Sequence, residues 1–349
     1  MWGLTFADLL YRYRQFLIAV LGAGVVLAMA LLLSGLAAGF GVEINQTVGA
    51  VGADRWVLAG NAQGRIAAVA TFPEADLHAI ASSPGVTRAD PLVILPSQVA
   101  HVGGQIKTVN VFGVRLGGLG DPRPTSGLAL SSPADAVTST SLGAVIGSEI
   151  EVGANRFRVV GTISDPTLLG GGPIIYMSVV DAQQLGLGGR PLITAAVTSG
   201  VPTQVPPGLV VFTDQQVESS TLAAMSSGVQ SINNSKVLMW AVAAIIIAAL
   251  LYVSALQRGR DFAVLKAIGS SSLNLFGSLA LEAVVVTLLA AAFAMIICNF
   301  MGGMFDQPVD IPGSAFATLP LIAVVVGIIS SLIALRRVTR ADPAAAFGG

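Results

Sequence analysis

Four long apolar stretches constrain this 349-residue chain more than any other feature. They are residues 17–38, 237–256, 275–297 and 317–335, and Glu282 is the single charged residue among them. Each is 19 to 23 residues long, which lets an α-helix cross a hydrocarbon layer of about 30 Å. Helices of this length that are apolar on every face are rare in water. The sequence therefore predicts a polytopic α-helical membrane protein with four transmembrane helices.

The composition agrees and excludes several classes of protein. Charged residues make up 11% of the chain, against about 25% in soluble proteins. An intrinsically disordered chain needs high charge and few aliphatic residues, and a disulfide scaffold needs more than one Cys. A net charge of −1 gives no overall basic field, so we expect no nucleic-acid partner.

Basic residues orient the predicted helices. Residues 1–16, 257–274 and 336–349 together carry eight Lys and Arg, whereas the 198 residues of segment 39–236 carry ten and residues 298–316 carry none. Lys and Arg are enriched in cytoplasmic loops, so both termini and residues 257–274 are predicted to be cytoplasmic. The first stretch is longer than the 7–15 apolar residues of a signal peptide, and we expect it to be retained.

Segment 39–236 is long enough for a folded extracytoplasmic domain between helices one and two, and its patterns are those of an α+β fold. Residues 55–59, 107–114 and 156–160 have the β-branched or alternating character of strands. Residues 72–82 and 179–187 are predicted short helices, and about 213–236 a helical stalk that leads into the second span. Residues 298–316 form a short outer loop and 336–349 a cytoplasmic tail.

The two other cytoplasmic segments have helical patterns. In residues 1–16, Trp2, Phe6, Leu9 and Tyr13 fall on one stripe, as in an amphipathic helix at a membrane surface. In residues 257–274, apolar side chains repeat every three residues from Phe262, and Gly269 follows as a helix end. That second helix would present an apolar patch to the cytoplasm, and docking of a partner protein and an ordinary loop both remain open.

Motifs for catalysis are absent from the sequence. A phosphate-binding loop needs Gly directly before its Lys, and none of the three Lys residues satisfies this, including Lys107 in GGQIKT. His78 and His101 lack the spacing of a zinc site, and LLGGGP at 168–173 is interpreted as a turn. We therefore expect no enzyme active site, no metal site and no cofactor bound by this chain.

Polar and small residues within the spans are candidates for packing or function. Glu282 would either form a structural pair near the cytoplasmic end of its helix or take part in ion translocation. Small residues four apart permit close approach of helices. They are Gly35 and Gly39 at the outer end of the first span, Ala244 and Ala248 in the second, and Gly327 and Ser331 in the fourth.

Two segments carry a family resemblance. RGRDFAVLKAIGSSSLNLFGSLALEAVVV at 258–286 has a basic-acidic start, a Lys-Ala-Ile-Gly core and a Glu-Ala pair, and RRVTRADPAAAF at 336–347 is an Arg-rich ending before Asp-Pro-Ala. Residues 13–25 and 147–185 match more loosely. These features resemble the MacB/FtsX-like permeases of type VII ABC transporters, in the branch with a separate ATPase that includes DevC-like and lipoprotein-releasing exporters. The segment 39–236 is then similar to a MacB-like periplasmic core domain.

The resemblance implies a multi-pass protein of the inner or plasma membrane that transmits ATP-driven motion. ATP and Mg would bind to a partner ABC ATPase docked on residues 257–274, with a second permease copy, membrane lipid and an extracytoplasmic adaptor as further partners. The implied coupling residues are Arg258, Arg260, Asp261, Phe262, Leu265, Lys266, Ile268 and Gly269.

Export or extrusion of a substrate is the leading function. A non-transporting mechanotransmitter that activates an envelope protein, a sensory receptor or adhesin, and a nutrient-uptake permease are the alternatives. The patterned segment 257–274 argues against a receptor or adhesin, because a mere anchor needs one span.

Overall fold

The computed structural model describes residues 13–68, 70–164, 167–257, 272–301 and 310–338. The chain divides into two compact units. The helical unit comprises residues 1–38, 228–305 and 309–349, and the sheet domain comprises residues 39–227 with 306–308. Most of the predicted N-terminal helix and of the C-terminal tail lies outside the described residues, as do residues 302–309 of the predicted outer loop. The ends of that loop, predicted at 298–316, are helical instead, because the preceding helix continues to Met301 and the following one begins at Gly313.

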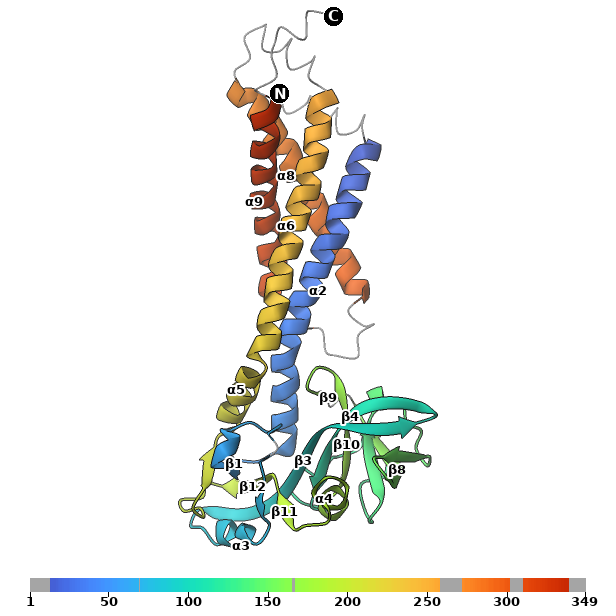
Figure 1. Ribbon diagram of the computed structural model, residues 1–349, viewed down its shortest axis with the longest axis vertical. Coiled ribbons are helices and arrows are strands. Elements are labelled where there is room, and N and C mark those ends of the chain that lie inside the picture. The colour runs from blue at the N-terminus through green and yellow to red at the C-terminus, as the bar shows by residue number, and fades with distance from the viewer. Residues whose placement is uncertain (1–12, 69, 165–166, 258–271, 302–309, 339–349) are drawn as a thin grey trace, which may run out of the picture. The chain divides into compact units, whose positions relative to one another are not determined.

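Four long helices account for the described part of the helical unit (Figure 1). They are α2 (Tyr13–Val51), α6 (Ser226–Gln257), α8 (Ser272–Met301) and α9 (Gly313–Val338). Three contain stretches long and apolar enough to cross a membrane, namely Phe16–Val51, Ser226–Leu250 and Ala280–Met301. The fourth predicted span falls in α9, whose apolar stretch Gly313–Ile329 is shorter.

Small side chains fill the core between these helices. One cluster of buried residues draws on all four helices, and alanine is its commonest member. Because alanine has a short side chain, it lets helix axes come close together where no hydrophobic effect drives their association. The cluster includes Ala23 and Leu27 of α2, Ala243 and Ile247 of α6, Ala290 and Ala294 of α8, and Ala323 and Val326 of α9.

Helix α2 extends thirteen residues past the predicted end of the first span at residue 38. Polar residues from Glu43 onward end the apolar run, but residues 39–51 contain no Pro that would interrupt the helix. The helix ends before Gly52, whose φ of 67° is the left-handed conformation typical of a helix C-terminus. Ile44, Val48 and Val51 recur at helical spacing and are buried in the core of the sheet domain.

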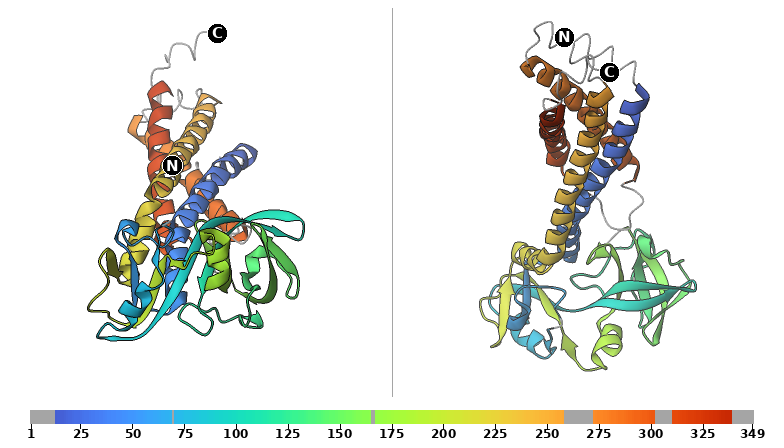
Figure 2. Two further views of the ribbon diagram at one scale, coloured as in Figure 1. Left: turned by 60° about the horizontal axis from the view of Figure 1, so that its bottom comes forward. Right: turned by 45° about the horizontal axis from the view of Figure 1, so that its top comes forward.

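An eleven-stranded mixed sheet forms the sheet domain (Figure 2). The strand order is β13-β1-β12-β3-β4-β10-β6-β8-β5, with β7 paired to β3 and β8, and β9 paired to β10. The pairs β4–β10 and β6–β8 are parallel and the others antiparallel. The strands are β1 (Arg55–Ala59), β3 (Val86–Val102), β4 (Gln105–Val114), β5 (Ser126–Gly127), β6 (Asp135–Ser139), β7 (Glu149–Val152), β8 (Asn155–Ile163), β9 (Thr167–Leu168), β10 (Gly172–Ser178), β12 (Ala195–Gly200) and β13 (Leu209–Phe212).

The 17-residue strand β3 joins the two halves of this sheet. Its first part pairs with β12 and its second part with β4, and a bulge between Leu95 and Gln98 separates the register of its pairing with β4 into two runs. Gly103 and Gly104 form the two-residue turn of the β3–β4 hairpin, so the GGQIKT segment is a hairpin turn followed by a strand.

Three short helices pack on the sheet. They are α3 (Asp76–Ala81) on β3, α4 (Val179–Leu187) on β3 and β4, and α5 (Asp214–Ala224) on β1. Two 3₁₀ turns, η1 (Gly60–Ala62) and η2 (Thr140–Leu142), follow β1 and β6. The strand predicted at residues 55–59 and the helix predicted at 179–187 coincide with β1 and α4.

Two predicted helical segments differ from the structure. Residues 72–82 were expected to form one helix, but Phe72–Pro73 is strand β2, which pairs with β11 (Leu192–Ile193). The pairing buries Phe72 and leaves α3 only six residues long. The predicted stalk, about residues 213–236, is helical in two pieces, α5 and the beginning of α6. Thr213 begins α5 with a capping box to Gln216.

Gly327 of α9 lies close against α8, where even a Cβ atom would be in tight contact. A Cβ atom at this position would be 3.2 Å from the carbonyl carbon of Ala283 and 3.0 Å from Oγ1 of Thr287. Backbone atoms cannot move aside as a flexible side chain can, so this contact fixes how closely α8 and α9 pack.

We expect Gly327→Leu to separate α8 from α9 and lower the stability of the helical unit by about 1–3 kcal/mol. The matched control is Gly277→Leu on α8, because nothing lies within 4 Å of a Cβ added at Gly277. Thermal unfolding in detergent micelles measures both variants. Equal unfolding midpoints for Gly327→Leu and Gly277→Leu would contradict the close packing.

Candidate functional site

The predicted coupling residues lie outside the part of the chain that the structure describes. Residues 258–271 lie outside the described residues, and this segment contains every position from Arg258 to Gly269 that the family resemblance assigned to ATPase docking. The helical pattern of this segment and the roles of its residues remain predictions.

Glu282 lies on α8 inside the helical unit, and only 1% of its surface is exposed. Ala283, Val286 and Thr287 are also buried along the same helix. Burial of a carboxylate in an apolar bundle is costly and requires compensating interactions. A structural role and a role in translocation both remain predictions for this residue.

The predicted small-residue positions occupy different environments. Gly35 and Gly39 of α2 are buried, whereas Ala244 and Ala248 of α6 are half-buried, each one position after a buried residue, Ala243 and Ile247. Ser331 of α9 is buried and donates a hydrogen bond to the carbonyl of Ile328 at 2.7 Å.

The structure shows one further close helix contact that no sequence pattern indicated. A Cβ at Gly24 of α2 would lie 3.1 Å from the carbonyl oxygen of Ala290 on α8. Its signal in the sequence was a single Gly among many, which did not distinguish it.

The sheet domain contains a buried carboxylate that is held entirely by backbone amides. Glu43, in the last third of α2, has 1% of its surface exposed. The N–H of Gly170 donates to Oε2 of Glu43 at 2.9 Å, and the N–H of Gly171 donates to Oε1 at 2.7 Å. Both carboxylate oxygens are therefore engaged by charge-assisted hydrogen bonds, which makes the burial of this charge tolerable.

The glycine loop that binds Glu43, residues 169–171 between β9 and β10, has an unusual backbone. Leu169, Gly170 and Gly171 have φ values of 60°, 87° and 87°. Positive φ angles are accessible chiefly to Gly. Successive residues in this conformation turn neighbouring N–H groups toward one anion. The glycine run interpreted from sequence as a plain turn thus binds an anion, and that anion is a side chain of the same protein.

Further hydrogen bonds fix the glycine loop on both sides. The hydroxyl of Thr47, one helical turn after Glu43, donates to the carbonyl of Thr167 at 2.9 Å. On the other side, Nδ2 of Asn110 in β4 donates to the carbonyls of Leu168 at 2.8 Å and Gly172 at 3.2 Å. The β9–β10 hairpin is therefore held between α2 and the centre of the sheet.

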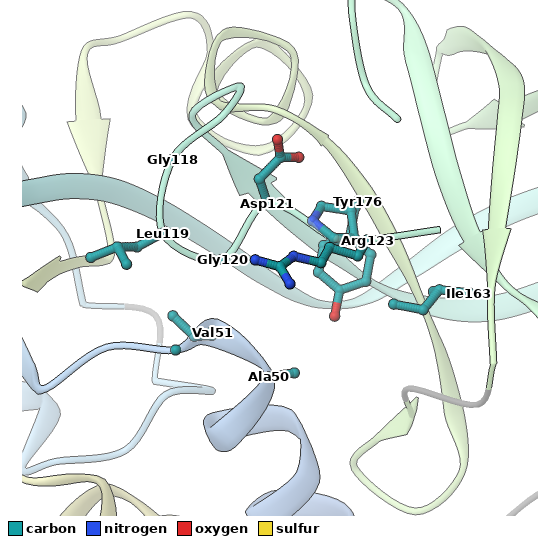
Figure 3. Close-up of a pocket in the computed structure, with 11 residues that line it drawn as sticks. Ala50, Val51, Gly118, Leu119, Gly120, Asp121, Arg123, Ile163 and Tyr176 are labelled. Atoms are coloured by element: carbon teal, nitrogen blue, oxygen red, sulfur yellow. The ribbon is translucent and has the colours of Figure 1, made fainter. Parts of the chain in front are cut away.

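A cavity of about 460 Å³ opens beside the C-terminal end of α2 (Figure 3). We call it the α2-end cavity. Its lining combines the helix end, residues 118–123 and two strand residues: Ala50, Val51, Gly52, Gly118, Leu119, Gly120, Asp121, Pro122, Arg123, Ile163 and Tyr176. The lining residues all belong to the sheet domain.

A buried aspartate shapes one wall of this cavity. Asp90, with 1% of its surface exposed, forms ion pairs with Arg88 at 2.6 Å and Arg115 at 3.0 Å. It also accepts a hydrogen bond from the N–H of Leu119 at 2.8 Å. The N–H of Gly120 donates to the carbonyl of Val51 at 2.9 Å, which ties the same loop to the last residue of α2. The cavity wall is therefore held by interactions from two directions.

Two ionisable groups of the lining have shifted pKa values. Burial raises the pKa of Asp121, and the hydrogen bond from the N–H of Gly117 opposes part of that rise. Burial also raises the pKa of the Tyr176 hydroxyl, so this group stays protonated over the physiological range and can donate a hydrogen bond. Within the described ranges, no cluster of three or more His, Cys, Asp or Glu side chains could hold a metal ion.

We expect Glu43→Gln to lower the free energy of unfolding of the sheet domain by about 1–3 kcal/mol. The amide has nearly the same size, but its NH₂ group faces a backbone N–H and loses one of the two hydrogen bonds. Urea unfolding followed by tryptophan fluorescence, to which the buried Trp56 contributes, measures the change. Gln46→Ala, at an exposed position of the same helix turn, is the control. A Glu43→Gln protein as stable as this control would contradict the assigned role.

The chain is similar to known proteins over nearly its whole length. Residues 236–343 match the family model described as FtsX-like permease C-terminal. Over 342 residues, covering 98% of both chains, the protein is 39% identical to the uncharacterized ABC transporter permease Rv2563 of Mycobacterium tuberculosis and 36% identical to the permease Rv0072 of the same organism.

Solved structures give a more distant similarity. The periplasmic region of MacB from Actinobacillus actinomycetemcomitans aligns with a TM-score of 0.37 and 13% identity, over 48% of this chain and 94% of that chain. The extracellular domain of the transporter YknZ from Gram-positive bacteria aligns with a TM-score of 0.34 and 12% identity, over 48% and 87%. On the full-length similarity to the mycobacterial proteins, the chain belongs to the FtsX-like family of ABC transporter permeases.

Proposed function

We propose that this permease couples ATP hydrolysis by a separate ATPase subunit to a conformational change of its sheet domain, and that the change drives export or extrusion of a substrate. The match of residues 236–343 to the FtsX-like permease model carries this proposal, because it includes the whole predicted coupling segment and the helices on both sides of it. The sequence supplies no phosphate-binding loop of its own, so ATP and Mg would be bound by the partner.

The ATPase would dock on residues 257–274. The apolar side chains of Phe262, Leu265 and Ile268 would bury against it, and the flanking basic residues would keep this segment on the cytoplasmic side. Both termini are then cytoplasmic, the sheet domain is extracytoplasmic, and α9 supplies a fourth span. In the proposed assembly two copies of the permease form a dimer in the inner or plasma membrane, and an adaptor binds on the extracytoplasmic side.

Motion would reach the sheet domain through α2. Residues of α2 up to Ala38 belong to the helical unit, and those from Gly39 belong to the sheet domain. A hydrogen-bonded helix transmits a displacement along its axis better than a flexible linker does. The contact of Glu43 with the glycine loop supports this route, because it fixes the outer part of α2 to the sheet.

The same attachment would serve a permease that transmits force without moving a substrate, and this is our second candidate. In that case the sheet domain would activate an envelope protein. Nutrient uptake is a weaker alternative, since no described feature favours it. Substrate-dependent stimulation of ATP hydrolysis in nanodiscs favours transport, whereas stimulation by an envelope protein alone favours transmission.

We expect the double substitution Leu265→Asp with Ile268→Asp to abolish permease-stimulated ATP hydrolysis, because it would bury two unpaired charges in the docking surface. The complex of permease and ATPase in nanodiscs is the sample, and phosphate release is the measurement. The matched control is Leu265→Met with Ile268→Val, which keeps the surface apolar and should retain stimulation. Stimulated hydrolysis in the aspartate variant, with unchanged thermal unfolding, would refute the docking assignment.

A further inference from the structure

We propose that the α2-end cavity binds a small organic acid, with its carboxylate at Arg123 and Tyr176 and its apolar body against the end of α2. The site lies within the sheet domain and does not depend on the proposed coupling to an ATPase. The cavity has the size and lining of a ligand site, two of its polar side chains converge, and its arginine has no carboxylate partner among the described residues.

The cavity has the size and lining of a small-molecule site. Its volume of about 460 Å³ falls within the range typical of ligand pockets, about 300–1,000 Å³. Val51, Leu119, Pro122 and Ile163 contribute apolar wall. Such a wall favours a ligand with a hydrocarbon or aromatic body, because contact removes apolar surface of both from water.

Two donors converge on this space. In Figure 3 the guanidinium of Arg123 and the hydroxyl of Tyr176 both point toward the end of α2, whereas the carboxyl of Asp121 points away from it. Arg123 is an exposed residue, and among the described residues no carboxylate pairs with it. A guanidinium is a cation with donors only, so it repels a cationic head group and attracts an anionic one, and the protonated phenol can donate a second hydrogen bond to the same anion.

The cavity is preformed, because interactions within the sheet domain hold its walls in place. Asp90, itself paired with Arg88 and Arg115, accepts a hydrogen bond from the N–H of Leu119, and the hydrogen bond from Gly120 to Val51 holds the next residue against α2. Tyr176 comes from the central strand β10, where its ring lies 5.6 Å from that of Phe112. A site fixed by the fold requires little ordering on binding, which benefits affinity.

A purely structural role for Arg123 is the competing explanation. A cation near the C-terminal end of a helix is favourable, because the last carbonyls carry partial negative charge. That role would make Arg123 matter for stability and leave the cavity without a ligand. The two explanations therefore differ in what they predict for ligand affinity.

Saturation-transfer NMR on the full-length protein in nanodiscs tests the proposal, with empty nanodiscs subtracted. The probes are 4-phenylbutyrate, 4-phenylbutylamine and 4-phenylbutanol, which share one body and differ in the charge of the head group. We expect saturable binding of the acid, much weaker binding of the alcohol and none of the amine. Arg123→Ala should raise the Kd of the acid by about tenfold to a hundredfold, as expected for charge-assisted hydrogen bonds.

Three further variants sharpen the test. Tyr176→Phe keeps the ring and should weaken the acid by a smaller factor, about threefold to tenfold. Ala50→Phe places a ring in the cavity from an exposed position of α2 and should abolish binding. Arg156→Ala removes an arginine whose side chain is 75% exposed on the same domain and should leave the Kd unchanged.

Three results would overturn the proposal. They are no saturable binding of the acid by the wild-type protein at millimolar concentration, an unchanged Kd in Arg123→Ala, and equal binding of the amine. Thermal unfolding of each variant is recorded alongside, and an Arg123→Lys protein provides a second test if Arg123→Ala unfolds. Lysine keeps the charge near the helix end and loses the bidentate geometry, so it should still weaken binding of the acid.

Discussion

The contact between the carboxylate of Glu43 and the glycine loop is the interaction on which the position of the end of α2 in the sheet domain depends. A buried charge in a helix would destabilise the fold unless its oxygens were hydrogen-bonded, and the amides of Gly170 and Gly171 supply those bonds. This contact explains the positive φ angles of the glycine loop, because they point two successive amides at one carboxylate. Residues 39–51 of α2 belong to the sheet domain, so this contact holds the last part of α2 within that domain.

This attachment gives α2 two roles along its length. Its first part lies in an alanine-rich bundle with α6, α8 and α9, and its last part lies in the apolar core of the sheet domain. The helix end then borders the α2-end cavity, whose wall is tied to Val51 by the N–H of Gly120. A ligand in that cavity would contact the same helix that Glu43 attaches to the sheet. In our account, α2 is the element where the membrane part, the sheet domain and a bound ligand would influence one another.

The sequence predicts the parts of this fold that depend on local pattern. Strand β1 and helix α4 could be placed from alternation and helical spacing, and long apolar runs locate the helices of the membrane part. Residues 39–51 were missed because the change to polar residues at Glu43 resembles the end of a span, although the helix continues until Gly52. Residues 72–73 were assigned to a helix because their pairing with residues 192–193 is far away in sequence.

The candidate sites were less predictable because they too join residues that are far apart in the sequence. Glu43 and the glycine loop are separated by more than 120 residues, and the local sequence of neither one indicates a contact with the other. The α2-end cavity likewise joins residues near 50, 120, 163 and 176, which only the sheet topology brings together. The family resemblance, in contrast, rests on contiguous residues in 258–286 and 336–347, so it could be recognised without a fold.

Hydrogen–deuterium exchange of the glycine loop measures whether ATP-driven motion reaches the sheet domain through α2. The amides of Gly170 and Gly171 are protected by the carboxylate of Glu43, so their exchange reports the state of the contact between α2 and the sheet. The measurement compares peptides covering residues 167–172 in the permease–ATPase complex without nucleotide and with ATP and vanadate. If ATP-driven motion reaches the sheet domain through α2, exchange in this loop changes between the two states. Identical exchange in both states, in a complex that hydrolyses ATP, would show that the motion does not pass through this contact.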